Sequence, residues 1–496
     1  MIQSLPHHTH QTHQRADLVR IAVDAMLERQ LLPEFSIQVA QELDAIAGAA
    51  NDAGPGVRDL RALLWCSIDN DDSQDLDQLT WCETLEGGST RMLVGIADVD
   101  ALVKKGSAID EHARTNAASI YTSARIFPML PERLSTNLTS LNAGEDRLAL
   151  VTDMVFSPDA RLQHFTVYRA LVQNQAKLAY DAVAAWIEGQ GPLPLAAQTV
   201  PGMDTQLRQQ DALAQQLRAL RRSHGALELE TFQPRAVFDG EKVVDILQQV
   251  QNRARQLIEE LMIATNGCNA RFLAGAGVGS LRRVVRSPER WLRIVEVARS
   301  FGEVLPPDPD SKALEDFLAG RHLADPLRFA DLSLVIVKLM GSGEYVVESP
   351  GGPPVGHFGL AVRDYTHSTA PNRRYPDLIT SRLLKATLAQ QSPPYSLGEL
   401  AALAQHCTRQ EDAARKVERR MRKSDAALLL ESRVGETFTA IVTGHSPNGA
   451  WVRLLSPPAE GKLVGSGAEP AVGTQIRVTL VSTNVERGFI DFVQVH

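Results

Sequence analysis

The sequence predicts a multidomain α+β protein with a short helical N-terminal module, a large α+β domain and a small C-terminal β-barrel. Three observations support this prediction. The chain has 496 residues, which suggests about three domains at roughly 150 residues each. Strand-like runs alternate with helical stretches over residues 57–432, as is typical of an α+β domain. Residues 433–496 instead place short strand-like runs between glycine, asparagine and proline turns, which is the pattern of a small barrel.

The first 56 residues are predicted to form two short helices and a linker. Apolar residues recur at helical spacing in two stretches, Leu18, Ile21, Met26 and Leu27 in the first and Val39, Leu43 and Ile46 in the second. Pro33 should end the first helix, and Ser36 is a candidate N-cap for the second. Such a pair is compatible with a helix-turn-helix module and equally with a small helical cap on the main domain. The segment NDAGPG, residues 51–56, is a linker by composition.

Residues 57–432 contain no second break of this kind. We expect strands in RMLVGIADV and RLALVTDMVF, and helices around residues 206–222, 250–273 and 378–390. A long charged helix should cover residues 408–431, and four or five strands of a barrel should follow. The predicted domains are therefore residues 1–56, 57–432 and 433–496.

Charge excludes one class of nucleic-acid binder. The formal net charge is −8, which argues against a protein that coats nucleic acid by its overall charge. A nucleic-acid site would have to gather its basic residues locally. Three clusters are available for a phosphate-lined channel, RKVERRMRK, LRRVVRSPERWLR and RALRR, although each is also typical of a solvated helix face.

Cysteine spacing and hydropathy bear on metal sites, disulfides and the cellular location of the protein. The four cysteines are widely spaced without a C-x-x-C pair, so neither a zinc site nor a disulfide framework is expected. The chain lacks an apolar run of about 18 residues and a signal-peptide pattern. We therefore expect a cytoplasmic protein without a membrane span, and a monomer.

The most informative segment is SIDNDDSQDLDQL. Within nine residues it carries Asp69, Asp71, Asp72, Asp75 and Asp77. Crowded carboxylates repel one another unless a cation neutralises them, and oxygen ligands favour Mg²⁺ or Mn²⁺. An EF-hand loop beginning at Asp69 would need glycine and glutamate where the chain has Gln74 and Thr80. Two readings remain: a catalytic site whose cations activate water at a phosphodiester, and a solvated acidic loop.

The surrounding residues, RDLRALLWCSIDNDDSQDLDQLTWCE, resemble the signature of the ribonuclease II family. In that signature an Arg-Asp-Leu-Arg segment precedes a strand ending in Ile-Asp, and a second acidic group follows six residues later. The resemblance implies that Asp69, Asp75 and Asp77 are metal ligands and that Asp77 is catalytic. Most members carry a fourth aspartate directly after the third. This chain has Gln78 there, so the expected ligand set has one negative charge fewer.

Further segments follow the family pattern in order between residues 57 and 430, namely GIADVDALVKKGSAIDEHA, SIYTSARIFPMLPERLSTNLTSLNAGEDRLAL, GALELE, QLIEELMIATN and HFGLAVRDYTHSTAPNRRYPDLITSRLL. The C-terminal barrel resembles the S1-type OB-fold domain that usually ends these proteins. The resemblance implies an RNB-type α+β catalytic domain. Residues 1–56 stand where family members usually carry two cold-shock-type OB domains.

The same resemblance assigns roles to residues that touch the nucleic acid. Arg373 in APNRRYPDL matches the catalytic arginine, whose guanidinium suits the charge on a scissile phosphate, and Arg374 beside it is expected to support it. Tyr121 and Tyr180 match aromatics that contact the terminal nucleotides, where stacking needs no particular base. Taken alone, a salt-bridged arginine and a half-buried tyrosine are the ordinary alternatives.

Two glutamates complete the expected site. Glu259 matches a family glutamate suited to a ribose 2′-OH, with Glu260 one residue away as the competing position. Glu418 matches another, against the alternative of an ion pair along a charged helix.

As a whole, the resemblance implies a processive 3′-to-5′ exoribonuclease that hydrolyses single-stranded RNA to nucleoside 5′-monophosphates with Mg²⁺, or with Mn²⁺. Gln78 favours an alternative, a catalytically weakened RNA-binding protein on the same scaffold. An endonuclease or a DNase on this scaffold is the third possibility.

Overall fold

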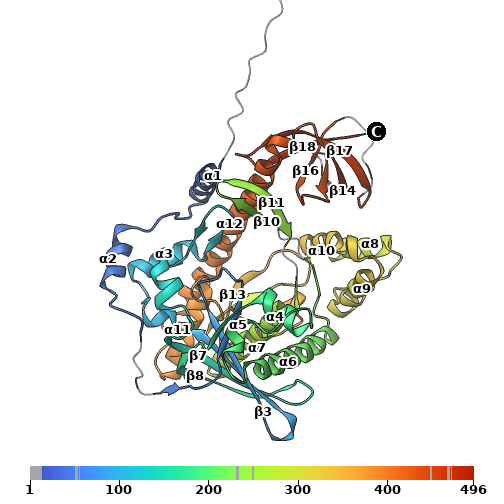
Figure 1. The fold of residues 1–496 in the computed structure, drawn as a ribbon. Coiled ribbons are helices and arrows are strands. Elements are labelled where there is room, and N and C mark those ends of the chain that lie inside the picture. The colour runs from blue at the N-terminus through green and yellow to red at the C-terminus, as the bar shows by residue number, and fades with distance from the viewer. Residues whose placement is uncertain are drawn as a thin grey trace, which may run out of the picture.

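The protein is described from a computed structural model that covers residues 14–495, except residues 51–53, 55, 231–233, 249–250, 447–448, 466–469 and 471. Figure 1 shows a large α+β body and, at one end, a small barrel reached by the long helix α12 (Leu397–Leu430). The predicted α+β class and C-terminal barrel are therefore confirmed.

A seven-stranded sheet forms the centre of the body. Its strand order is β1-β8-β7-β4-β3-β2-β9. The strands are β1 (Val57–Asp59), β8 (Leu162–Gln173), β7 (Asp146–Phe156), β4 (Thr90–Ala97), β3 (Gln78–Thr84), β2 (Cys66–Asp69) and β9 (Ala176–Ala179). Strand β4 is buried almost throughout because helices cover both faces of the sheet.

Alternate residues of β4 enter two different cores, as the period of two in a strand requires. Met92, Val94 and Ile96 pack into one core, which is covered by α4 (Tyr180–Ile187), α5 (Leu195–Gln198), α6 (Met203–Ser223) and α7 (Arg253–Gly275). Leu93 and Ala97 pack into the other, which is covered by α3 (Ala108–Asn116), α11 (Tyr375–Leu388) and part of α12.

Helix α12 joins the body to the barrel. Ser396 and Glu399 form a capping box at its start, and its 34 residues extend for about 50 Å at 1.5 Å per residue. The closed barrel follows in the order β14-β15-β16-β18-β17. Its strands are β14 (Thr437–Ser446), β15 (Gly449–Leu454), β16 (Glu460–Leu463), β17 (Gln475–Asn484) and β18 (Phe489–Gln494).

Smaller elements surround the sheet. Helices α8 (Trp291–Ser300), α9 (Ser311–Ala324) and α10 (Pro326–Met340) share a separate core. Three antiparallel pairs complete the fold, β5 (Ile120–Tyr121) with β6 (Ile126–Phe127), β10 (Pro234–Asp239) with β11 (Lys242–Gln248), and β12 (Ser280–Val284) with β13 (Glu344–Glu348).

The two N-terminal helices do not form a helix-turn-helix unit. Helix α1 (Arg15–Leu27) packs on α12 and the barrel end of the molecule, whereas α2 (Ile37–Ala45) packs on α3. Ser36 caps α2 as predicted, accepting a hydrogen bond from the Val39 amide at 3.3 Å. Leu27 is expected on the buried stripe, but 56% of it is exposed because it lies off the buried face of α1, which is formed by Leu18, Ile21, Ala22, Ala25 and Met26.

Two further expectations concern burial. All four cysteines are buried and free. Among the helices of the described residues, none combines the length and the apolar character that a membrane span needs.

Candidate active site

The acidic segment begins where strand β2 ends. Asp69 is the last residue of β2, which pairs in parallel with β9 so that Asp69 lies opposite Ala179. Parallel strands end at the same edge of a sheet, and Tyr180, directly after β9, therefore lies beside Asp69. The Asp69 Oδ1 accepts hydrogen bonds from the Asn70 amide at 2.7 Å and from the Ser73 hydroxyl at 3.0 Å.

The loop that follows is fixed by its backbone. Leu76 is buried, and its amide donates to the Ser140 hydroxyl at 3.0 Å. The Ala97 amide of β4 donates to the Asp77 carbonyl at 3.0 Å. Asp75 and Asp77 flank Leu76, and the side chain of Asp77 is only 1% exposed. The loop thus holds two carboxylates at a set position above the sheet edge.

Arg373 meets this loop from almost three hundred residues further along the chain. The Arg373 Nε donates to Asp77 Oδ2 at 3.1 Å, and the Asn372 amide donates to Asp77 Oδ1 at 3.0 Å. The Ser119 amide donates to the Arg373 carbonyl at 3.0 Å. In the part of the chain that the structure describes, the two terminal amino groups of Arg373 have no hydrogen-bond partner.

Arg374 points to a different partner. Its guanidinium donates to Asp377 Oδ1 at 2.8 Å and more weakly to the Thr369 hydroxyl at 3.5 Å. It therefore anchors the segment that carries Arg373, and its expected contact with RNA stays a prediction.

Tyr121 is held at both ends. Its hydroxyl donates to Asp75 Oδ2 at 3.0 Å, and its amide donates to Glu418 Oε1 of α12 at 3.1 Å. With 40% of the residue exposed, the ring offers a face next to the carboxylates. The contact of Glu418 with the Tyr121 backbone replaces the ion pair along the helix that was the alternative.

Tyr180 contacts α7, the helix that also carries Glu259. The Arg255 guanidinium of α7 sits 4.4 Å from the centroid of the Tyr180 ring and donates to Asn70 Oδ1 at 2.9 Å. Glu259, one helical turn beyond Arg255, is exposed. Glu260 is 3% exposed and binds Arg221 through two hydrogen bonds of 2.6 and 3.0 Å. Of the two glutamates, Glu259 is the one left to meet a ligand.

The site carries more negative charge than Arg373 balances. Burial, with the charge of Asp75 adding, raises the pKa of Asp77 to about 7 despite Arg373. Burial likewise raises the pKa of Asp75, although Tyr121 and Arg373 oppose the shift. Three carboxylates face one guanidinium, and this arrangement fits an added cation with oxygen ligands.

These carboxylates do not form a ready-made cage. Among the described residues, no group of three or more histidine, cysteine, aspartate or glutamate side chains is gathered closely enough to hold a metal ion. The neighbouring residues do not complete one: Asp72 pairs with Arg235 at 2.5 Å, and the buried Gln78 donates its amide to the Ile68 carbonyl at 3.5 Å. A cation would therefore bind by displacing hydrogen bonds that Asp69, Asp75 and Asp77 now make.

Adjoining cavities lie between the barrel and Arg373. A barrel cavity of about 710 Å³ contains Trp451 and Lys423. It shares Ala236, Arg422 and Asp425 with an active-site cavity of about 470 Å³. The active-site cavity contains Asp75. Through a second set of shared residues, Ser119, Tyr121 and Glu418, it adjoins an inner cavity of about 190 Å³ that reaches Arg373.

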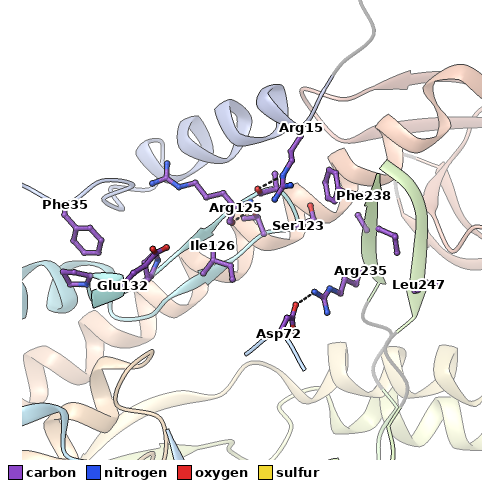
Figure 2. Close-up of a pocket in the computed structure, with 16 residues that line it drawn as sticks. Arg15, Phe35, Asp72, Ser123, Arg125, Ile126, Glu132, Arg235, Phe238 and Leu247 are labelled. Carbon is purple, nitrogen blue, oxygen red and sulfur yellow. Dashed lines mark hydrogen bonds and ion pairs between the residues drawn. The ribbon is translucent and has the colours of Figure 1, made fainter. Parts of the chain in front are cut away.

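A side cavity of about 1040 Å³ also joins the active-site cavity, because both are lined by Ser123 and Ile126. Figure 2 shows Arg235 of the β10–β11 hairpin and Asp72 of the acidic loop paired between the two. Arg15 at the start of α1 donates to the Ala124 carbonyl at 3.1 Å on the opposite wall.

Only one of the three basic clusters lines this path. In LRRVVRSPERWLR, the buried Arg282 and Arg283 bind Glu348 and Glu411. The arginines of RALRR are likewise engaged in internal ion pairs, Arg218 with Glu228, Arg221 with Glu260, and Arg222 with Glu228 and Glu315. The cluster on α12 provides Arg419, Arg422 and Lys423 to the barrel cavity. Of the three clusters that could line a channel, the one on α12 lines these cavities, whereas the arginines named above in the other two are ion-paired to carboxylates of the protein.

Comparison with known proteins identifies the family of the chain. Residues 57–390 match the RNB domain, and residues 436–495 match the RNase II-type exonuclease C-terminal S1 domain. The chain belongs to the RNB family. The predicted relationship to ribonuclease II-type proteins is thereby confirmed, as is the identity of the barrel as an S1 domain.

Individual relatives agree with this family. Ribonuclease R of Escherichia coli (strain K12) is 30% identical over 95% of this chain and 62% of its own length. Ribonuclease R of Thermotoga maritima is 30% identical over 93% of this chain and 68% of its own length. The apo form of Mycoplasma genitalium RNase R superposes with a TM-score of 0.86 at 22% identity, covering 97% of this chain and 78% of that one. The chain thus spans about 62% of the length of the Escherichia coli relative.

Proposed function

We propose that this RNB-family chain is an exoribonuclease that binds single-stranded RNA on its barrel and hydrolyses it from the 3′ end to nucleoside 5′-monophosphates. One observation carries the proposal: adjoining cavities, lined by cations and aromatic rings, run from the barrel past Asp75 to Arg373, which is hydrogen-bonded to Asp77. Relatives named ribonuclease R support the activity. So do the complexes of Mycoplasma genitalium RNase R with single-stranded and double-stranded RNA.

The chain's own residues would divide the work as follows. Asp77 orients Arg373 through Nε, which leaves the two terminal amino groups of the guanidinium for a phosphate oxygen. Tyr121 offers its ring to the terminal bases while Asp75 and Glu418 fix its position. The narrowness of the inner cavity, about 190 Å³, favours an unpaired strand end over a duplex.

A divalent cation, Mg²⁺ or Mn²⁺, would be held by oxygens of Asp69, Asp75 and Asp77. When bound, it would supply an activated water and charge stabilisation for phosphodiester hydrolysis. The placement of all three carboxylates around the single guanidinium of Arg373 supports this proposal. We further propose that the protein is cytoplasmic, which its four free, buried cysteines support, and that it is a monomer.

The test is cleavage of a 5′-labelled single-stranded RNA with Mg²⁺, with Mn²⁺ and with chelator. We expect metal-dependent loss of one nucleotide at a time from the 3′ end and little cleavage of DNA. Asp71→Asn is the matched control for Asp77→Asn, because Asp71 is exposed in the same loop. Mid-sized internal fragments would indicate an endonuclease, and equal cleavage of DNA a general nuclease. Tight binding without cleavage in either metal would establish the weakened RNA-binding protein instead.

A further inference from the structure

One face of α12 runs along the proposed RNA path. Glu418, Met421, Arg422 and Asp425 all line the active-site cavity, and their spacing of three, four and seven residues places them on one side of a helix. Asp425 lies two turns from Glu418, about 10 Å along the helix axis. It also lines the barrel cavity. Asp425 therefore sits where the two cavities meet.

The carboxylate of Asp425 is buried and only half satisfied. The residue is 3% exposed, and its Oδ2 accepts a hydrogen bond from the Ser123 hydroxyl at 2.7 Å. Its Oδ1 has no hydrogen-bond donor among the described residues. Leaving a buried acceptor unpaired is costly, and this burial raises the pKa of Asp425 to about 7. The folded protein therefore keeps an energetically unfavourable carboxylate where the two cavities meet.

The neighbours of Asp425 show which part of a nucleic acid it suits. Arg422 and Lys423 on the preceding turn of α12, and Arg419 one turn before them, line the barrel cavity and suit phosphates. A carboxylate repels phosphates, so Asp425 is suited to a hydrogen-bond donor on the strand. The hydrogen-bond donors of the bases differ from one base to the next. The ribose 2′-OH is instead present in every RNA nucleotide and absent from DNA. It is therefore the donor that can reach Asp425 at every position as the strand advances by one nucleotide.

We propose that Asp425, steadied by Ser123, forms a ribose-reading subsite that accepts a hydrogen bond from the 2′-OH of a nucleotide lying between the barrel and the active site. The torsion that turns an aspartate carboxylate is broad, so the unpaired oxygen turns toward the strand without a change of backbone. This subsite deepens the proposed function, on which it rests. It selects RNA over DNA at a position 5′ of the nucleotides that Tyr121 and Arg373 contact.

The experiment measures binding without turnover. Fluorescein-labelled RNA strands carrying one 2′-deoxy or one 2′-fluoro nucleotide, moved along the strand from the 3′ end, are titrated by anisotropy in chelator. For the wild type at pH 8, above the pKa of Asp425, we expect affinity to fall about tenfold at one internal position, as for a hydrogen bond to a charged group. Both substitutions remove the donor and should act alike there.

The variants separate this role from a general one. Asp425→Ala should flatten the profile at that position and leave the others unchanged, whereas Asp425→Asn, which keeps an acceptor oxygen and the side-chain shape, should retain part of it. Asp412→Ala is the matched control, because Asp412 lies on the same helix and lines none of these three cavities. Melting curves confirm that each variant is folded.

An identical position profile in the wild type and in Asp425→Ala would overturn the proposal. So would equal loss of RNA and DNA affinity in Asp425→Ala, because that would show a general contribution to the channel. The titrations measure binding and need no cleavage. If the protein cleaves RNA but its affinity does not depend on the position of the modified nucleotide, the subsite is refuted and the proposed function is not. A protein that never cleaves RNA yet shows the profile refutes the exonuclease and not the subsite.

Discussion

Asp377 is the buried anchor of the segment that positions Arg373. Its side chain is fully buried, and its Oδ1 accepts hydrogen bonds of 2.8 Å from the amides of Thr369 and Ala370 and from the Arg374 guanidinium. Asp377→Asn keeps the shape of the side chain and removes its charge. An amide oxygen can still accept from the backbone, but the half-buried Arg374 guanidinium loses its counter-charge.

The expected magnitude follows from the loss of that counter-charge. Removing one partner of a buried ion pair costs about 3–5 kcal/mol, so Asp377→Asn should lower the free energy of unfolding of the catalytic domain by that amount. The displaced segment also moves Arg373 away from Asp77. We therefore expect kcat to fall by at least about a hundredfold, as for loss of a positioned transition-state donor. RNA affinity in chelator should change little, because the barrel cavity lies elsewhere.

Urea unfolding and single-turnover cleavage measure the two effects. The control is the double variant Asp377→Asn with Arg374→Met, which removes both charges; it should recover most of the lost stability. If Asp377→Asn unfolds at the wild-type urea concentration and cleaves RNA at the wild-type rate, then Asp377 does not hold Arg373 in place. If the double variant is no more stable than the single one, the buried charge is not the cause.

Four further outcomes can be measured. Asp77→Asn should abolish cleavage and leave RNA affinity within about twofold, since catalysis and binding are separable free energies; wild-type turnover would refute the assignment. Trp451→Ala, which removes the ring beneath Lys423 in the barrel cavity, should cost roughly 1–3 kcal/mol of affinity per stacked base with kcat at saturation unchanged; unchanged affinity would exclude stacking there. Tyr121→Phe should keep affinity where Tyr121→Ala loses it, as titration would show. The pKa of Asp425 is raised from 3.8 to about 7 in the folded protein, so wild-type stability is lost as pH rises through 7. Asp425→Asn should match the wild type at pH 4 and exceed it by up to about 4 kcal/mol at pH 8, and equal urea midpoints at pH 8 would contradict the shift.

Local patterns in the sequence predicted many of the helices and strands and the family resemblance. The apolar periods of RLALVTDMVF and of residues 250–273 anticipated β7 and α7, and the turn-rich C-terminus anticipated the barrel. These signals are local, since the period of two or 3.6 is a property of consecutive residues. The β10–β11 hairpin and helices α8–α10 were not predicted from the sequence, because their apolar runs are short, although their main packing partners are close by in the chain.

The sequence by itself determined that clustered aspartates, a distant Arg373 and a C-terminal barrel belong to one protein, because residue order and spacing are enough to reveal a family pattern. Only the tertiary structure decided which charges are available. It shows that the buried Arg282 and Arg283 are paired with Glu348 and Glu411, whereas Arg422 lines the path. It also brings Asp425 to the junction of two cavities with an unpaired oxygen. Burial and pairing depend on residues far apart in the chain, and so no local pattern records them.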